Sequence, residues 1–225
     1  MRSESPERLA YEALLAAVPD CPQFPRLREA LGRGENVDDR ELDAVFPETA
    51  QVLSRIHWTP VRVVRRTCQF LIPRPGTRVL DVGSGVGKFC LVGSLLSAGE
   101  FTGIEQRAEF VRLARQIGQH YRISRAAFFH GNARDLDWAA YDAIYLYNPY
   151  CEARYPQRQI DLDIPAGPAV FREYVRMTRA QLRRCQIGTR VALYHGFGGR
   201  MPESYELSFS EPCGSGQLDG WIKVR

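Results

Sequence analysis

Residues 80–89, Leu-Asp-Val-Gly-Ser-Gly-Val-Gly-Lys-Phe (LDVGSGVGKF), place glycine at every second position, 83, 85 and 87, directly after an apolar run. Glycines at the junction of a strand and a helix let the backbone approach a ligand closely and adopt positive φ. The pattern around this stretch decides the fold, and the spacing of the glycines limits the ligand.

Short strand-like runs alternate with helical stretches after the turn signal at residues 75–76. Strands are predicted at 78–82, 101–105, 126–131, 141–148 and 189–196, and helices at 87–99, 108–123 and 168–185. This alternation predicts a parallel sheet with helices on both faces. Residues 204–212 and 217–225 flank a glycine-rich turn and predict an antiparallel hairpin at the sheet edge. The predicted fold is doubly wound α/β, with a mainly parallel seven-stranded sheet.

The first 75 residues show helical apolar spacing, interrupted by prolines. Helices are predicted at 7–17, 26–31, 38–45 and 59–71, the last with Thr59 as its N-cap and Pro60 as its first residue. The sequence therefore predicts two parts: an N-terminal helical extension or lid, residues 1–75, and a sheet domain, residues 76–225. As part of a lid, Trp58 would reach a ligand pocket; otherwise it packs under the helix.

The composition excludes several classes of protein. No run reaches the roughly 18 apolar residues that a membrane span needs, and the first residues lack the pattern of a signal peptide, so we expect a cytoplasmic chain. The six cysteines form no C-x-x-C pair, which fits neither a disulfide framework nor a zinc site, and no metal is expected. A net charge of +4 does not by itself indicate nucleic acid and leaves partner and oligomeric state open.

Two common phosphate loops fit the glycines poorly. A P-loop needs glycine at position 82 and a hydroxyl at position 89, where this chain has Val82 and Phe89. A dinucleotide loop needs a small third residue, where Lys88 or Cys90 stands. The sequence therefore excludes a P-loop, whereas it only weakens the case for a dinucleotide-binding loop.

The spacing Asp81-x-Gly83-x-Gly85-x-Gly87 resembles the first motif of the class I S-adenosylmethionine-dependent methyltransferases, and the resemblance extends from about residue 76 to 225. It implies a Rossmann-like fold whose glycine loop wraps the amino acid and ribose parts of S-adenosylmethionine. That ligand has no phosphate, so neither lysine nor magnesium is required.

Further cofactor contacts are expected at the ends of the second and third strands. Glu105, in GIEQR, follows the glycines by about the interval at which a carboxylate accepts hydrogen bonds from ribose hydroxyls, a role that would also suit a dinucleotide. The stretch HGNARD resembles the family segment that meets the adenine amino group, and the Asn132 side chain offers the required acceptor. By this resemblance the predicted cofactor-binding residues are Asp81, Gly83, Ser84, Gly85, Gly87, Glu105, Gln106, Asn132, Ala133 and Asn148.

The fourth strand ends in Asn148-Pro149-Tyr150, which resembles the [DNS]-P-P-[YF] motif of amine and amide methyltransferases. In that family the polar side chain and a proline carbonyl hold the target nitrogen and the aromatic ring packs on it. This chain has one proline instead of two, which moves the aromatic residue one position closer and weakens the inference of a nitrogen acceptor. The predicted catalytic residues are Asn148, Tyr150 and His195, the last at the end of the fifth strand, where an imidazole can take a proton.

The predicted function is methyl transfer from S-adenosylmethionine to an unidentified acceptor. Two alternatives stay open: a nicotinamide-dependent oxidoreductase, and a non-catalytic S-adenosylmethionine-binding protein that uses a basic helix for a partner. That helix carries arginines at helical spacing, interpreted as a solvated face that borders the apolar one. These arginines are Arg172, Arg176, Arg179 and Arg183.

Overall fold

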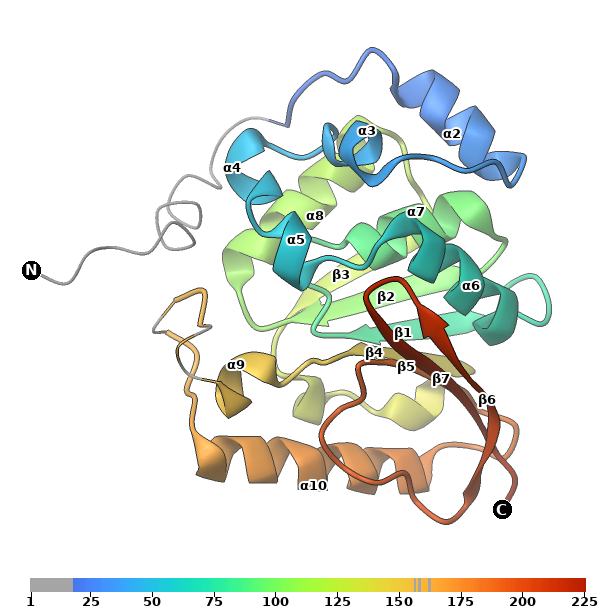
Figure 1. Cartoon of the computed structure of the whole chain (residues 1–225), viewed down its shortest axis with the longest axis vertical. Coiled ribbons are helices and arrows are strands. Elements are labelled where there is room, and N and C mark those ends of the chain that lie inside the picture. Colours follow the sequence, from blue (N-terminus) through green and yellow to red (C-terminus); the bar gives the residue numbers. More distant parts are fainter. Residues whose placement is uncertain (1–17, 156, 158, 162) are drawn as a thin grey trace, which may run out of the picture.

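The computed structural model describes residues 18–155, 157, 159–161 and 163–225, so the helix predicted at 7–17 lies outside the described residues (Figure 1). The described strands form one seven-stranded sheet in the order β3-β2-β1-β4-β5-β7-β6. The strands are β1 (Arg78–Val82), β2 (Glu100–Glu105), β3 (Ala126–His130), β4 (Ala143–Tyr147), β5 (Arg190–Tyr194), β6 (Tyr205–Cys213) and β7 (Gly216–Lys223).

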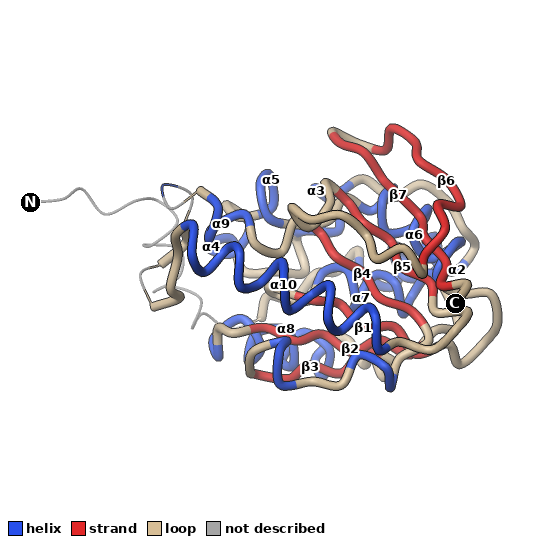
Figure 2. The backbone as a smooth tube through the Cα atoms, turned by 90° about the horizontal axis from the view of Figure 1, so that it is seen from below, coloured by secondary structure: helices blue, strands red, loops and turns tan. Residues whose placement is uncertain are grey.

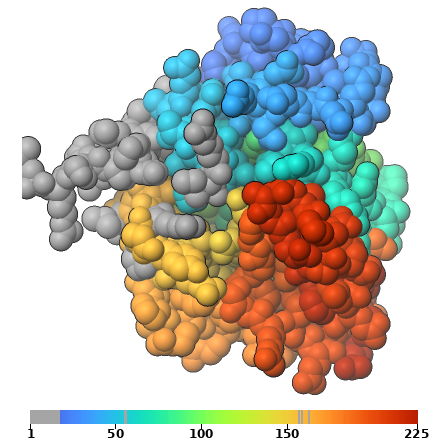
Figure 3. Space-filling model, viewed as in Figure 1, coloured from blue at the N-terminus to red at the C-terminus, as the bar shows by residue number. Residues whose placement is uncertain are grey.

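Strands β1 to β5 run parallel, and the C-terminal hairpin adds two antiparallel strands at one edge. β7 pairs with β5 and β6 lies outermost, which confirms the predicted fold class. The hairpin also contacts the N-terminal part of the chain, because Arg66 pairs with Glu211 at 2.5 Å. Figure 3 shows the red hairpin lying against the cyan-to-teal segments.

Alternate residues of the parallel strands face opposite layers of helices, as the period of two requires. On one face, side chains such as Val79, Phe101 and Tyr145 pack with α6 (Val61–Leu71), α7 (Lys88–Leu96) and α8 (Ala108–His120). On the other face, side chains such as Leu80 and Ile144 pack against α10 (Pro168–Arg184). Figures 1 and 2 show α10 across this second face, together with the short helix α9 (Cys151–Arg154) and the short turns η1 (Ala133–Asp135) and η2 (Trp138–Ala140).

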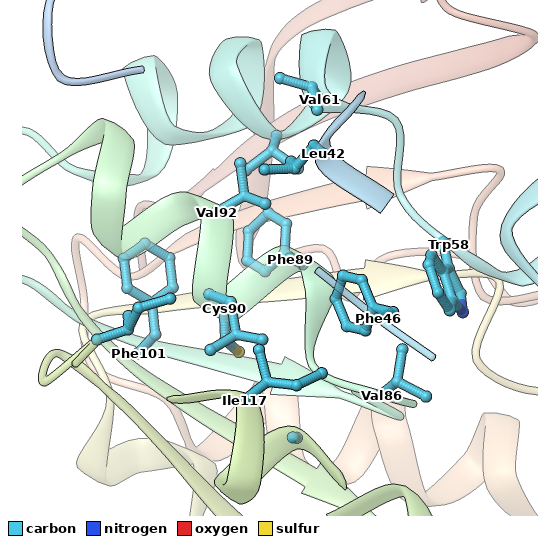
Figure 4. Close-up of a cluster of buried hydrophobic side chains, with 14 of the residues drawn as sticks. Leu42, Phe46, Trp58, Val61, Val86, Phe89, Cys90, Val92, Phe101 and Ile117 are labelled. Carbon is cyan, nitrogen blue, oxygen red and sulfur yellow. The ribbon is translucent and has the colours of Figure 1, made fainter. Parts of the chain in front are cut away.

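The N-terminal helices share the core of the sheet. They are α2 (Phe24–Gly32), α3 (Asp39–Asp43), α4 (Glu48–Gln51), α5 (Ser54–His57) and α6. One continuous cluster of buried apolar side chains joins them to α7 and to the strands. Figure 4 shows Leu42 and Phe46 beside Phe89 and Val92 of α7. The predicted N-terminal extension therefore shares buried side chains with the sheet domain.

The start of α6 differs from the prediction. Pro60 is its N-cap, with extended backbone at φ −61° and ψ 146°, and the helix begins at Val61. The Thr59 hydroxyl, predicted to cap the helix, instead lies 3.0 Å from the hydroxyl of Tyr145 on β4. A cap was the wrong prediction because the buried Tyr145 hydroxyl needs a partner of its own.

Among the helices described, none combines the length and the apolar character that crossing a bilayer requires.

Candidate functional site

A cavity of about 300 Å³ opens at the carboxyl ends of β1, β2 and β4. Strands β1 and β4 are neighbours there, although the chain leaves them toward opposite faces of the sheet, and ligands bind in the crevice at such a switch point. Every predicted site residue except Gly87 lines this cavity, including all three predicted catalytic residues.

The three glycines of the loop have different surroundings, although all have positive φ. A side chain at Gly85 would meet nothing within 4 Å, and one at Gly83 would make ordinary contact with Pro149 at 3.6 Å. A Cβ at Gly87 would lie 2.6 Å from the Phe128 ring. Gly83 and Gly85 therefore expose backbone to the cavity, whereas Gly87 permits close packing and begins α7 as its N-cap.

The Glu105 carboxylate, at the end of β2, connects the glycine loop to the next turn. Its Oε2 accepts a hydrogen bond from the Gly85 N–H at 3.1 Å and its Oε1 accepts one from the Arg107 N–H at 3.0 Å. Burial raises the pKa of Glu105, and the nearby Arg107 opposes that shift. Each oxygen keeps a second lone pair, so the carboxylate can still accept hydrogen bonds from a ligand.

Arg107 is a cavity residue that the sequence did not identify. Its buried guanidinium lies 3.7 Å from Glu105 and 2.7 Å from Glu152, and it also pairs with Asp161. The pKa of Arg107 is raised by these carboxylates despite burial. One arginine thus compensates three acidic side chains. In the sequence, the feature that could have indicated this role is its position two residues after Glu105.

Asp81 is buried beneath the loop, one residue before the end of β1. Its carboxylate accepts a weak hydrogen bond from Cys90 Sγ at 3.5 Å, and burial raises its pKa to about 7. The neighbouring Ser84 hydroxyl is buried and has no hydrogen-bond partner within the described residues. A carboxylate and a hydroxyl at the floor of the cavity are therefore left for a ligand to engage.

Lys88 has a role different from that of a phosphate-loop lysine. The side chain is 3% exposed, and its Nζ lies 2.7 Å from Asp39 and 2.6 Å from Asp43, both on α3. Burial raises the pKa of Asp43, and Lys88 opposes that shift. This ion triad fixes α3 to the start of α7, next to the cavity wall formed by Trp58 and Thr59.

Asn132 belongs to a small polar network rather than standing alone. Its Nδ2 donates to Gln106 Oε1 and to the Tyr174 hydroxyl, each at 3.1 Å, and its Oδ1 accepts the Arg134 N–H at 3.1 Å as the cap of η1. The predicted acceptor for an adenine amino group is therefore partly occupied. Ala133 follows it along the cavity wall, and Tyr174 of α10 reaches the same wall unanticipated by the sequence.

Both strand ends beside the predicted reaction centre have unusual backbone. Asn148, after β4, has φ +37° and His195, after β5, has φ +59°. Non-glycine residues with positive φ are uncommon and gather at functional sites, where the fold supports the strain. Burial lowers the pKa of His195, so its imidazole is neutral near pH 7 and can accept a proton.

Tyr150, predicted to be catalytic, also has a structural role. Its ring stacks on Tyr174 with centroids 4.8 Å apart, and its buried hydroxyl lies 2.6 Å from Thr178 Oγ1. This hydroxyl joins α10 to the end of β4, so the predicted role of Tyr150 rests on its ring, which lines the cavity, and stays a prediction. Tyr147, whose ring centroid lies 5.7 Å from that of His195, also lines the cavity.

Comparison with known proteins identifies the domain. A family model described as a methyltransferase domain matches residues 73–180, the part that contains the glycine loop, Glu105, Asn132 and Asn148. Residues 73–180 therefore match a methyltransferase domain, and the match covers most of the parallel sheet and most of α10.

Relatives of this chain include a 23S rRNA (uracil(1939)-C(5))-methyltransferase, RlmD, of Shewanella sp. strain ANA-3, 35% identical over 100 residues. The match spans 44% of this chain but only 21% of that protein. A second RlmD, from Nitrosococcus oceani, is 34% identical over 80 residues, 36% of this chain and 18% of that protein. The chain thus spans about a fifth of the length of the curated relatives it matches.

Solved structures share the fold of this chain. An RNA methyltransferase from Salinibacter ruber in complex with S-adenosyl-L-homocysteine aligns with a TM-score of 0.55 at 17% identity, over 74% of this chain and 94% of that one. TrmN from Thermus thermophilus aligns with a TM-score of 0.56 at 18% identity, over 78% of this chain and 53% of that one. At these identities the likeness concerns the fold alone.

The donor groups of the cavity fit S-adenosylmethionine. The carboxylates in and around the cavity outnumber the two cationic side chains described there, Lys88 and Arg107. Both cations are themselves paired with acidic side chains. Such an excess of negative charge favours a ligand that carries an ammonium and a sulfonium group. The open backbone at Gly85 and the unpartnered Ser84 hydroxyl supply neutral contacts. A pyrophosphate would find no free cation among these described residues.

Proposed function

We propose that this chain transfers the methyl group of S-adenosylmethionine to a nitrogen atom of its acceptor. The supporting observation is that a loop for an adenosyl ligand and two strained strand ends, Asn148 and His195, meet in one cavity. In this assignment Asp81 faces the ammonium group, Glu105 the ribose, and Asn132 with Ala133 the adenine. When bound, S-adenosylmethionine supplies an electrophilic methyl carbon on a positively charged sulfur.

The residues at the end of β4 can orient an amino group. The Asn148 side chain offers one acceptor, and within the described residues no N–H donates to the Pro149 carbonyl, which also borders the cavity. If these two acceptors hold the two hydrogens of an amine or amide, the nitrogen lone pair is left pointing at the methyl carbon. Alignment of this kind lowers a barrier by up to roughly 7–11 kcal/mol at best.

Electron and proton balance assigns a role to His195. The nitrogen lone pair forms the new N–C bond while the C–S pair leaves with the sulfur, and the methylated nitrogen must then lose a proton. The neutral imidazole of His195 accepts that proton, since neither ring nitrogen has a hydrogen-bond partner within the described residues and burial keeps its pKa low.

The two alternatives receive less support from the site. A nicotinamide dinucleotide carries two phosphates, and the cavity presents paired cations and several carboxylates instead. A non-catalytic binding protein would not need two strained residues at the place where the acceptor meets the cofactor.

Transfer of a labelled methyl group tests the proposal. Protein and tritiated S-adenosylmethionine are incubated with fractionated RNA, protein and small-molecule extracts. We expect Asn148→Ala to lower the rate at least about 100-fold while leaving cofactor binding within about threefold, as loss of an orienting contact implies. Asn36→Ala, in an exposed loop, serves as the matched control. Equal rates for Asn148→Ala and wild type would reject the strand-end assignment.

A further inference from the structure

The outer face of α10 carries four arginines without ion-pair partners. Among the residues that the structure describes, no carboxylate lies within ion-pair distance of any of them, whereas Arg184 and Arg134 nearby are both paired. They stand at intervals of four, three and four residues, which places them on one stripe about 16 Å long. These four arginines, Arg172, Arg176, Arg179 and Arg183, are called the arginine stripe below.

The stripe faces away from the sheet. The buried positions of α10 are Tyr174, Thr178, Gln181 and Leu182, which lie on the opposite side of the helix. The sequence predicted arginines that border the apolar face, and the half-buried Phe171 and Val175 do pack against the core beside the stripe. The buried Tyr174 and Gln181 extend that face to the side opposite the stripe. Figure 2 shows α10 as the nearest element, with no other helix or strand crossing in front of it.

The far end of the stripe enters a basic hollow. Arg179, Arg183, Arg225 and Lys223 line it together with Ser204, and Glu203 is its one acidic residue. The Arg179 Nε is buried and has no hydrogen-bond partner within the described residues. That nitrogen is shielded from solvent, so the donors within reach of a phosphate oxygen are those of the exposed Arg183 and Arg225.

Lys223 compensates the partial negative charge at the C-terminal end of α10, which would otherwise disfavour a bound anion. The last carbonyls of a helix carry partial negative charge, which repels anions. The Lys223 Nζ lies 2.5 Å from the Arg183 carbonyl and 2.7 Å from the Cys185 carbonyl, and it is buried there. A full positive charge therefore covers the negative end of α10.

The near end of α10 leads to the cavity. Its Tyr174 lines the cavity and hydrogen-bonds Gln106 at 3.0 Å, and the Gly167 N–H, directly before the helix, donates to the Ala153 carbonyl at 3.0 Å. The first turns of α10 therefore lie next to the cavity, with Tyr174 on the inner side of the helix and the Arg172 end of the stripe on its outer side.

We propose that the arginine stripe and its hollow bind the phosphodiester backbone of an RNA acceptor. This inference rests on the proposed function and names its substrate class. The repeated positive charges match a ligand with a phosphate at every residue, and the shallow, solvent-facing position suits backbone contacts without base readout. An acidic protein segment is the competing occupant, and it lacks the groups that would satisfy a guanidinium fork at each step as regularly.

The test measures binding of a short fluorescein-labelled single-stranded RNA by anisotropy, from roughly 0.05 to 0.2 M salt. The variant replaces Arg172, Arg176, Arg179 and Arg183 by alanine. The control replaces Arg26 and Arg28 of α2, Arg33 directly after α2 and Arg40 of α3 by alanine, which changes the net charge equally on the other side of the molecule (Figure 1). We expect the α10 variant to bind about 10- to 100-fold more weakly and its salt slope to fall by about 2–3, since each phosphate contact contributes about 0.7.

Equal losses in the two variants, or no loss in the α10 variant, would overturn the proposal, and so would displacement of RNA by polyglutamate at equal charge. Titration with S-adenosylmethionine is performed on each protein in parallel. Unchanged cofactor binding in the α10 variant shows that the cavity is intact. Wild-type protein that binds RNA as expected but not S-adenosylmethionine would refute the proposed function and leave the RNA surface standing.

Discussion

The Glu105 carboxylate accepts a hydrogen bond from the backbone N–H of Gly85 at 3.1 Å, so the end of β2 holds the glycine loop that follows β1. The carboxylate expected to bind the cofactor therefore also shapes the loop that would surround it. This double role makes Glu105 the most informative position for a binding experiment.

Glu105→Gln should raise the Kd for S-adenosylmethionine about 10- to 100-fold. The substitution keeps the shape but removes a charged acceptor, and hydrogen bonds to charged groups contribute about 1.5–3 kcal/mol each. Isothermal titration calorimetry measures the change. Glu100→Gln, at the exposed opposite end of the same strand, is the control and should bind like wild type. An unchanged Kd for Glu105→Gln would remove it from the cofactor site.

Gly87→Ala should lower the free energy of unfolding by about 1–3 kcal/mol, because its φ of +84° and the Phe128 ring both exclude a side chain. Urea denaturation measures the loss. Gly32→Ala in α2 meets no atom within 4 Å and should be neutral or slightly stabilising. If Gly87→Ala is fully stable but fails to bind cofactor, Gly87 is a ligand contact after all.

Lys88→Met should destabilise the protein by about 3–5 kcal/mol, since it leaves the buried Asp43 without its cation. The triple variant with Asp39→Asn and Asp43→Asn should recover part of that loss, because the uncompensated charges are gone. Arg40→Met, on the exposed side of α3, provides the control in the same denaturation series. A triple variant no more stable than Lys88→Met would show that the ion triad does not hold α3.

The pKa of Asp81, raised to about 7 by burial, makes stability depend on pH. Between its unfolded pKa of about 3.9 and about 7, the folded chain holds a proton that the unfolded chain has lost. The contribution of Asp81 to the free energy of unfolding therefore falls as pH rises through this window, by about 2–4 kcal/mol in total. Denaturation at several pH values should show a smaller slope for Asp81→Asn.

The affinity for S-adenosylmethionine should depend on the same Asp81 proton, but it should rise with pH where the free energy of unfolding falls. A cationic ligand favours the charged carboxylate, so the affinity of wild type for S-adenosylmethionine should rise between pH 6 and 8, with release of a proton near neutral pH. Calorimetry in buffers of different ionisation enthalpy measures the proton. Wild type and Asp81→Asn with the same pH profile would place the ammonium group elsewhere.

The sequence predicted the sheet well because its signals are local. The strand at 78–82 matches β1, and the other parallel strands differ only at their ends. Helix ends were less accurate: α8 stops at His120 rather than 123, where Arg122 takes φ +51° to turn the chain toward β3. This turn contains neither glycine nor proline, so the local sequence did not predict it.

The candidate site was predicted where it depends on strand ends, because parallel strands bring those ends together. Tertiary partners were not predictable. Lys88 pairs with Asp39, 49 positions away in sequence, and Tyr150 bonds Thr178, 28 positions away. Each partner lies on an element whose packing decides the contact, so neither spacing nor residue type could indicate it.

The most direct test of the account is a calorimetric comparison of S-adenosylmethionine with NAD on the wild-type chain at pH 8. The acidic cavity with paired cations predicts binding of S-adenosylmethionine at micromolar or lower Kd, about −8 kcal/mol or stronger, and no measurable binding of NAD. Binding of NAD together with no measurable binding of S-adenosylmethionine would contradict the assignment of S-adenosylmethionine as the cofactor.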